Sequence, residues 1–291
     1  MSMLETRNIC FAYPNRTVAL QGVDFTAGDG EFIGILGANG SGKTTLLKIL
    51  NGLLKPTAGE VRLNGENINS GNKNLLFTRI CTMFQNPDNQ LFSPTVGEDV
   101  AFGPANMGLS NIEIERRTEY ALDSVEMSEF ADKAIHNLSH GQKKRICLAG
   151  VLAISPEVIL LDEPTASLDP MGVSCIMHLL KDLNREKNIT MIMATHSVDL
   201  VPVFIDRVVI LNEGKIIREG LPEEVFSDAE MIRRAKLKLP RIGQLFEILK
   251  KQDGFDIDSL PLTIGEARGE LVKLFTFGRG VDLISDAEQN I

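Results

Sequence analysis

The chain has few side chains suited to stacking on bases, since it contains no tryptophan and only two tyrosines among its 291 residues. Its four cysteines lie far apart and form no C-x-x-C pair, which argues against a metal site or a disulfide framework and favours reduced, buried thiols. No apolar run approaches the roughly 18 residues that cross a bilayer, and no secretory signal is visible at the N-terminus. We therefore expect a cytosolic protein.

The chain also lacks a surplus of basic residues. Lys and Arg number 30 against 39 Asp and Glu, which gives a net charge of −9. An acidic chain with so few aromatics is a poor candidate for a nucleic-acid binder. Small phosphate-bearing ligands stay possible, because inward-facing backbone amides can bind phosphate on an acidic protein. The hydrophobic share of 43% excludes a disordered chain, and the length fits one large domain, or one domain with an appendix.

Short apolar runs alternate with helical patterns along most of the chain, which predicts an α/β fold. The runs at 32–36, 158–161 and 190–194 have no polar alternation, as is typical of strands buried on both faces of a parallel sheet. The predicted helices cover 43–51, 112–125, 141–152, 173–185 and 242–251. Further strands are predicted at 61–63 and 81–84, and a hairpin at 207–218.

A glycine-rich loop follows the first of these buried strands and opens a helix. It matches the pattern G-x-x-x-x-G-K-S/T, whose residues here are Gly37, Ala38, Asn39, Gly40, Ser41, Gly42, Lys43 and Thr44. In such a loop the glycines let backbone N–H groups turn toward phosphate oxygens, and the helix start adds its positive dipole end. Lys43 would bind the β- and γ-phosphates of a nucleotide, and Thr44 would hold Mg²⁺.

Two acidic residues, Asp162 and Glu163, follow the apolar run 158–161. A buried parallel strand would carry them to the edge of the sheet where α/β proteins bind ligands. Asp162 would complete the Mg²⁺ shell, directly or through water. Glu163 would polarise the water that attacks the nucleotide.

A second set of residues resembles the ATP-binding cassette (ABC) family. Residues 138–142, Leu-Ser-His-Gly-Gln, are similar to its LSGGQ signature, with His140 where that family usually has glycine. Gln85 resembles the glutamine loop, residues 167–169 resemble the aspartate loop, and His196 resembles the switch histidine. Tyr13 resembles the aromatic residue that stacks on adenine. The similarity covers about residues 3–225.

The resemblance implies a fold and a division of the chain. The fold would be an ABC ATPase domain over 1–225, in which a RecA-like parallel sheet is joined by an antiparallel β part and a helical subdomain at about 86–155. Residues 226–291 would form a C-terminal extension that helps dimerisation.

The resemblance also implies that ATP and Mg²⁺ bind and that ATP is hydrolysed. Glu163, His196 and Gln85 would be catalytic, and Thr44, Gln85 and Asp162 would hold Mg²⁺. The residues around ATP would be Tyr13, Gly37, Ala38, Asn39, Gly40, Ser41, Gly42, Lys43, Thr44, Thr45 and Asp162.

In the ABC family the signature contacts the nucleotide held by the opposite subunit. The residues that would do so here are Ser139, Gly141, Gln142 and Asp169. The resemblance therefore implies a head-to-tail dimer, formed with a second copy or with a homologous ATPase, that closes on two ATP molecules. His140 puts a close approach of the backbone to ATP in doubt at that one position.

Residues 84–92 and 95–104 are similar to the ATPases of energy-coupling-factor importers, in particular those for cobalt and nickel. This resemblance implies a peripheral location at the cytoplasmic face of the cell membrane. The partners would be a membrane-embedded coupling protein and a substrate-binding membrane protein, and a groove beside Gln85 would receive a short cytoplasmic helix.

Several alternatives stay open. The cargo could be a vitamin or another small solute. The chain could be a soluble ABC ATPase outside transport, although the stretch between Lys43 and Ser139 has no sustained heptads. It could also bind nucleotide without hydrolysing it, although Glu163 and His196 argue against that. A P-loop kinase is a further alternative, but such an enzyme does not need the signature-like residues 138–142.

Overall fold

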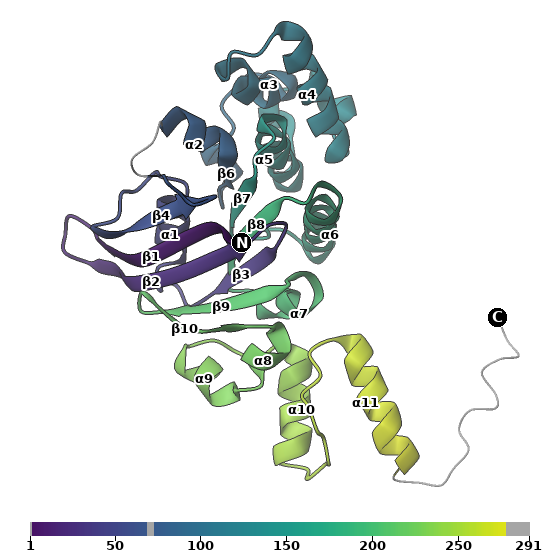
Figure 1. Ribbon diagram of the computed structural model, residues 1–291. Helices are drawn as coiled ribbons and strands as arrows, with labels where there is room; N and C mark the ends of the chain where they lie inside the picture. The colour runs from purple at the N-terminus through teal and green to yellow at the C-terminus, as the bar shows by residue number, and fades with distance from the viewer. Residues whose placement is uncertain (1, 69–72, 278–291) are drawn as a thin grey trace, which may run out of the picture.

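Two β-sheets lie at the centre of the molecule (Figure 1), and the computed structural model describes residues 2–68 and 73–277. The larger sheet has the strand order β10-β9-β3-β8-β7-β6 and is parallel from β9 to β6. Its strands are β3 (Phe32–Leu36), β6 (Ile80–Met83), β7 (Val158–Asp162), β8 (Thr190–Thr195), β9 (Arg207–Asn212) and β10 (Lys215–Gly220). The predicted runs at 32–36, 81–84, 158–161 and 190–194 are thus confirmed as strands.

Each central strand of this sheet sends alternate side chains into two different apolar cores, which explains its unbroken hydrophobic run. Ile33 and Ile35 point into one core, together with helix α1 (Lys43–Leu50). Phe32 and Leu36 point into the other, together with helix α6 (Pro170–Lys187). The sheet is therefore covered on both faces, and its carboxyl edge is left open for a ligand.

The smaller sheet is antiparallel and has the order β2-β1-β4-β5. Strands β1 (Ser2–Ala12) and β2 (Val18–Gly28) are long, and β4 (Ala58–Leu63) and β5 (Glu66–Asn67) follow. The predicted strand at 61–63 is the second half of β4. The length of β1 and β2 comes from their pairing across register irregularities, and no single local pattern predicts that pairing.

A group of helices follows β6. They are α3 (Val96–Asn106), α4 (Asn111–Ser124) and α5 (His140–Ile154), which lie together at the top of Figure 1. Helix α5 packs against both α3 and α4. The helices predicted at 112–125 and 141–152 are confirmed. The assignment of residues 86–155 as a subdomain stays a prediction.

The hairpin predicted at 207–218 is confirmed as β9 and β10. Its turn residues, Glu213 and Gly214, have φ values of 49° and 77°. Two consecutive positive φ values give the turn a twist that matches antiparallel strands, and glycine adopts such a value at low cost.

The helices after β10 are α8 (Pro222–Phe226), α9 (Ala229–Arg234), α10 (Arg241–Lys251) and α11 (Ile264–Phe277). They lie on the side of the molecule opposite α3–α5 (Figure 1). The helix predicted at 242–251 is confirmed as α10, whereas α11 was not predicted. The start of a separate extension at residue 226 stays a prediction.

The remaining elements are short. Helix α2 (Lys73–Arg79) precedes β6, and helix α7 (Val201–Phe204) precedes β9. Turns of 3₁₀ helix cover Pro87–Asn89, Ser128–Phe130, Ile135–Asn137 and Val198–Leu200. Within residues 2–68 and 73–277, we find no helix with the length and hydropathy required to traverse a bilayer.

The cysteines agree in part with the expectation of buried thiols. All four are free, and Cys81 and Cys147 are buried, whereas Cys10 and Cys175 are half-buried. Burial raises the pKa of the Cys81 and Cys147 thiols to about 12, so both are protonated and unreactive near neutral pH.

Candidate nucleotide-binding site

The glycine-rich loop lies between β3 and α1, as the sequence predicts, and its backbone leaves no room for larger residues at two positions. A Cβ atom at Gly37 would lie 2.3 Å from the carbonyl oxygen of Leu211. Gly42 has φ 110°, and a Cβ atom there would lie 2.6 Å from the carbonyl oxygen of Ala19. Glycine is therefore required for the loop to turn into the start of the helix.

The loop fits a phosphate group. The Ser41 hydroxyl is buried and has no hydrogen-bond partner among the described residues. The Lys43 ammonium donates to the carbonyl oxygens of Gly37 at 2.7 Å and Ala38 at 3.2 Å. Burial lowers the pKa of Lys43, and the carboxylates of Glu163 and Asp162 oppose that shift. An unpaired hydroxyl and a buried ammonium at a helix N-terminus suit an anion with several oxygens.

Thr44 and Asp162 meet at the carboxyl end of β7. The Thr44 hydroxyl donates to a carboxylate oxygen of Asp162 at 3.1 Å. Burial raises the pKa of Asp162, and the bond from Thr44 works in the opposite direction. A hydroxyl and a carboxylate are oxygen ligands of the kind that Mg²⁺ takes beside substrate phosphates, so this pair fits the predicted cation.

Glu163 stands next to Asp162 and faces His196. The His196 Nδ1 lies 2.9 Å from one carboxylate oxygen of Glu163, and the Thr195 hydroxyl donates to the other at 3.4 Å. Glu163 is 7% exposed, and its backbone is left-handed with φ 49°. A carboxylate held in this way at the edge of a cleft can accept a proton from a water molecule inside it.

These groups line a cleft of about 400 Å³. The predicted site residues on its walls are Tyr13, Asn39, Gly40, Gly42, Lys43, Thr44, Thr45, Gln85, Asp162, Glu163 and His196. Gly37, Ala38 and Ser41 belong to the loop but are not among the lining residues. The Tyr13 hydroxyl is hydrogen-bonded to the Thr45 hydroxyl at 2.9 Å.

Three further residues, Thr17, Val18 and Ala19, also line the cleft, although no sequence motif points to them. Val18 is 58% exposed although it is apolar, so it forms an apolar part of the cleft wall next to Tyr13. A single exposed valine at the start of a strand gives no recognisable pattern, and only the folded β2 shows where it points.

The signature residues are not part of this cleft. Ser139 and Gln142 form a capping box at the start of α5, in which the Gln142 amide oxygen accepts from the Ser139 N–H at 2.9 Å. Asp169 caps α6 by accepting from the Gly172 N–H at 2.6 Å. One copy of the chain therefore brings together the phosphate loop, the acidic strand end and His196, but not Ser139, Gly141, Gln142 or Asp169. His140 is half-buried, and its Nε2 has no hydrogen-bond partner among the described residues.

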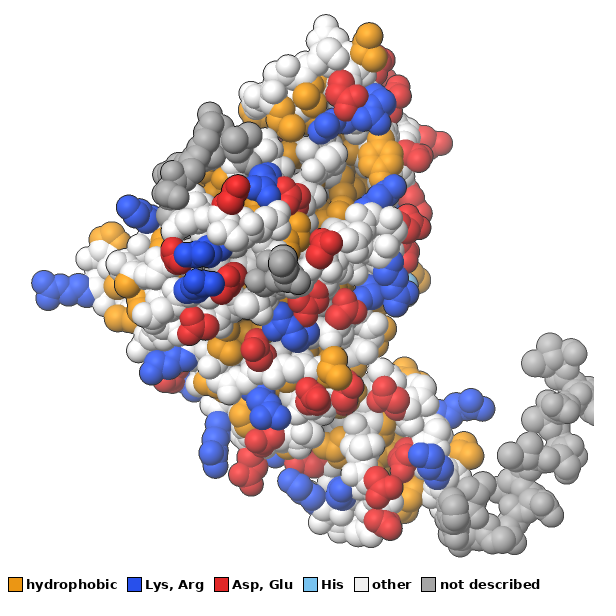
Figure 2. All heavy atoms as spheres, in the orientation of Figure 1, with side chains coloured by type: hydrophobic (Ala, Val, Ile, Leu, Met, Phe, Trp, Pro, Cys, Tyr) orange, Lys and Arg blue, Asp and Glu red, His pale blue; other side chains and the backbone are white. Residues whose placement is uncertain are grey.

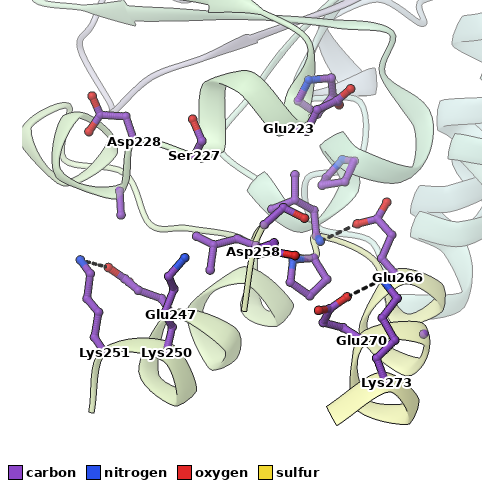
Figure 3. Close-up of a pocket in the computed structure, with 18 of the residues that line it drawn as sticks. Glu223, Ser227, Asp228, Glu247, Lys250, Lys251, Asp258, Glu266, Glu270 and Lys273 are labelled. Atoms are coloured by element: carbon purple, nitrogen blue, oxygen red, sulfur yellow. Dashed lines mark hydrogen bonds and ion pairs between the residues drawn. The ribbon is translucent and has the colours of Figure 1, made fainter. Parts of the chain in front are cut away.

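A larger cavity, of about 1060 Å³, lies among the C-terminal helices (Figure 3). Acidic side chains outnumber basic ones on its walls. Several of these charges are paired with one another, as Glu247 with Lys251 at 2.9 Å and Glu270 with Lys273 at 3.0 Å. An acidic lining repels phosphate, so this cavity is not a second nucleotide site.

Acidic and basic side chains are interspersed over the face of the molecule in Figure 2. Neither sign forms a continuous area on that face. That face therefore has no broad positive field that would attract phosphate.

Comparisons with known proteins agree with this geometry. Residues 20–166 match the model of the family described as ABC transporter. The chain is 54% identical over 273 residues to the energy-coupling factor transporter ATP-binding protein EcfA of Methanococcus maripaludis, across 93% of this chain and 98% of that protein.

Two solved structures are also similar. One is cbiO1 from Clostridium perfringens, described as part of the ABC transporter complex cbiONQ, with 45% identity and a TM-score of 0.74. That similarity covers 85% of this chain and 99% of cbiO1. The other is a dimeric post-hydrolysis state of the ATP-binding cassette MJ0796 bound to ADP and Pi, with 32% identity and a TM-score of 0.68. It covers 76% of this chain and 99% of that structure.

Proposed function

The chain belongs to the ABC transporter family, and we propose that it is the ATP-hydrolysing subunit of an energy-coupling-factor importer for cobalt or nickel. As a member of that family it is an ATPase with the α/β fold of ABC ATP-binding domains. The observation that supports hydrolysis best is that Lys43, the Thr44–Asp162 pair and the Glu163–His196 pair face one cleft.

In this proposal different residues of the chain bind the phosphates, hold the cation and activate the water. The amides of residues 37–44 and the Lys43 ammonium bind the phosphates. Thr44 and Asp162 would hold Mg²⁺, together with Gln85 from the wall of the same cleft, and a bound Mg²⁺ would neutralise phosphate charge. Glu163 orients a water molecule and accepts its proton, while His196 fixes the carboxylate of Glu163. Tyr13 stacks on the adenine, beside Val18.

The proposal includes a head-to-tail dimer, because the signature residues lie away from the cleft of their own chain. Ser139, Gly141, Gln142 and Asp169 would complete the site of a second copy or of a homologous ATPase. The similar structure of MJ0796 is dimeric. We expect a Glu163→Gln variant to sediment as a dimer with ATP and as a monomer without it. A chain that stays monomeric with ATP at high concentration would contradict the proposed dimer.

The docking site for the membrane partner is proposed to be a groove of about 260 Å³ beside the helices α3 and α5. Phe92 and Phe102 line it, are 66% and 48% exposed, and make an edge-to-face contact with ring centroids 4.6 Å apart. Exposed aromatic side chains in a groove are suited to the apolar face of a short helix. This groove is close to Gln85, since Phe84 lines it too.

Residues 226–291 are proposed to assist dimerisation. Several apolar side chains of the C-terminal helices are exposed, namely Leu245, Ile248, Phe255, Ile264, Val272 and Phe275. A second copy of the extension is the occupant that we propose for them. Sedimentation of a Leu245→Ser, Ile248→Ser double variant is expected to show a weaker dimer, and an unchanged dimer would remove the extension from the interface.

The cargo and the location at the cytoplasmic face of the membrane are tested together. The chain is purified from membranes with the proteins bound to it, and the complex is placed in vesicles that contain ATP. We expect uptake of radioactive cobalt or nickel, and we expect Glu163→Gln in the same complex to abolish it. Uptake of a vitamin with no uptake of either metal would replace the proposed cargo but retain the importer. A chain that binds no membrane protein would overturn the importer itself.

A further inference from the structure

Lys144 is a fully buried lysine that the proposed mechanism does not use. It lies in α5 and is 0% exposed. Its ammonium donates to the carbonyl oxygen of Pro164 at 2.8 Å and to that of Glu163 at 3.3 Å. Burial lowers the pKa of Lys144 to about 8, with the charge of Glu163 among the opposing effects. A buried cation costs free energy unless it is well paired, so an apolar side chain would serve packing better.

The two carbonyl groups that Lys144 contacts belong to the strained backbone at the proposed base. Glu163 has φ 49°, in the left-handed region that non-glycine residues adopt at a cost of about 1–3 kcal/mol. Other bonds support this conformation, because the Glu163 N–H donates to Ala194 and its carbonyl accepts from the Ala166 N–H. Lys144, on helix α5, adds a charged donor that reaches the carbonyl groups of both Glu163 and Pro164.

The backbone and the carboxylate of Glu163 are thus held by different elements. Thr195 and His196, after β8, contact the carboxylate oxygens. Lys144, on α5, contacts the main chain. A shift of the main chain by a fraction of an ångström would move the carboxylate relative to the water that it polarises, and such shifts lower catalytic rates strongly.

We propose that Lys144 is a positioning residue that holds the Glu163–Pro164 main chain so that the Glu163 carboxylate stays at its catalytic position. This inference rests on the proposed role of Glu163. It also gives α5 two functions, because the N-cap residue of the same helix is Ser139, which would face the nucleotide of the partner. Ser139, which would serve the partner's nucleotide, and Lys144, which would support the base of its own chain, are five residues apart, or about 7.5 Å along the helix.

The test removes the ammonium of Lys144 and keeps an unbranched apolar side chain of four heavy atoms, as many as the lysine side chain has carbons. We expect Lys144→Met to lower kcat for ATP hydrolysis by about 10–100-fold and to leave KM for ATP within about twofold. The matched control is Lys143→Met, one residue earlier in α5, where the ammonium pairs with exposed Asp88 at 2.7 Å. The control is expected to keep kcat within about twofold, because this pair is at the surface.

A double-mutant cycle then distinguishes positioning from general stability. In the Glu163→Gln background, where no base is left to position, Lys144→Met is expected to have no further effect on single-turnover hydrolysis. An equal loss in both backgrounds, or a wild-type kcat for Lys144→Met, overturns the inference. If Glu163→Gln alone hydrolyses ATP near the wild-type rate, the proposed base is wrong and the inference fails with it.

A second variant covers the case in which Lys144→Met does not fold. The side chain in Lys144→Gln is shorter by one bond, so its amide cannot reach both carbonyl groups. It is expected to lower kcat in the presence of Glu163 and not in the Glu163→Gln background. A wild-type kcat for a folded Lys144→Gln chain also overturns the inference, and thermal unfolding of each variant shows that the chain is folded.

Discussion

Lys43 carries the most specific prediction at the scale of single residues. Its ammonium is buried and aimed into the loop that would surround the phosphates. We expect Lys43→Met to weaken ATP binding and to abolish turnover, whereas Glu163→Gln keeps ATP binding and lowers turnover about 10²–10⁴-fold. Calorimetric titration with ATP and measurement of released phosphate separate the two effects.

The control for Lys43 is Lys55→Met, which removes an exposed lysine shortly after the same helix. It should leave both ATP affinity and turnover unchanged. A Lys43→Met chain that binds ATP as tightly as the control would contradict the assignment of Lys43 to the phosphates.

The residue scale also shows which site residues a sequence can identify. Gly37–Thr44 form one continuous segment whose pattern depends on local backbone geometry, so the sequence predicts them without knowledge of the fold. Asp162 and Glu163 follow an apolar run for an equally local reason. Lys144 gives no such signal, because its partners are Glu163 and Pro164, far along the chain, and only the packing of α5 brings them together.

At the scale of elements, Arg117 connects two helices of the group above the sheet. Its guanidinium, on α4, donates to the Ile154 carbonyl oxygen at 3.1 Å and to that of Ala153 at 3.4 Å, both at the C-terminal end of α5. These carbonyls have no partner inside the helix, so a cation there stabilises the helix end. We expect Arg117→Met to lower the free energy of unfolding by about 1 kcal/mol, which corresponds to a Tm decrease of about 2–4 °C.

Arg116→Met is the matched control for Arg117. Arg116 is the neighbouring arginine and pairs with the same Glu113, but its side chain is 66% exposed. Its removal should change Tm by less than about 1 °C. Equal decreases for the two variants would show that the bonds to α5 add no stability.

Glu113 makes the same element sensitive to pH. Hydrogen bonds from Arg116 and Arg117 lower the pKa of Glu113 from 4.5 to about 2. Because the folded chain favours the ionised carboxylate, its contribution to stability is present above pH 4.5 and is lost as the pH falls toward 2. The Tm difference between wild type and Glu113→Gln should be largest at pH 7 and should shrink as the pH is lowered to about 3.

Salt provides the second measurement for Glu113. The ion pairs of Glu113 with Arg116 and Arg117 are accessible to solvent. About 1 M NaCl at pH 7 should therefore also reduce the Tm difference between wild type and Glu113→Gln. A difference that is constant over both pH and salt would mean that Glu113 acts through packing rather than through its charge.

Helices and strands can be predicted from the sequence where the burial pattern stays the same along the whole element. The buried runs of β3, β7 and β8 and the amphipathic pattern of α10 are examples, because burial on both faces or on one face leaves a distinct periodicity. β1 and β2 are less distinct, since each contains positions where the pairing register shifts, and a shift breaks the alternation on which the prediction depends. Helix α11 has few buried side chains among those described, so its sequence carries no regular apolar face that would predict a helix.

At the scale of the whole molecule, apolar packing divides the C-terminal part in two. The main core includes side chains between residues 226 and 239, and Leu262 further along the chain. Those of the first stretch are Phe226, Ala229, Ile232, Ala235, Leu237 and Leu239. Phe246, Ile257 and Ala267 form a small separate cluster with α10 and α11. Ion pairs connect α10 with the rest of the molecule, one between Arg233 and Glu247 and another between Asp199 and Arg241. Because residues 226–239 pack into the main core, a cut at residue 240 should disturb that core less than a cut at 225, the predicted end of the ATP-binding domain.

Two truncated chains test where that boundary lies. A chain that ends at residue 240 keeps Phe226 and Ile232 in place, so it is expected to fold, bind ATP and unfold at a temperature close to that of the full chain. A chain that ends at residue 225 loses both, and each fully buried side chain of this size contributes about 1.5–3 kcal/mol. Together with the other side chains of 226–239, this loss approaches the total stability of an ordinary domain, about 5–15 kcal/mol. The shorter chain should therefore aggregate or unfold at a much lower temperature, and its uncovered core should bind a hydrophobic dye. Two truncated chains with the same Tm would mean that residues 226–239 contribute nothing to the main core and would move the boundary back to 225.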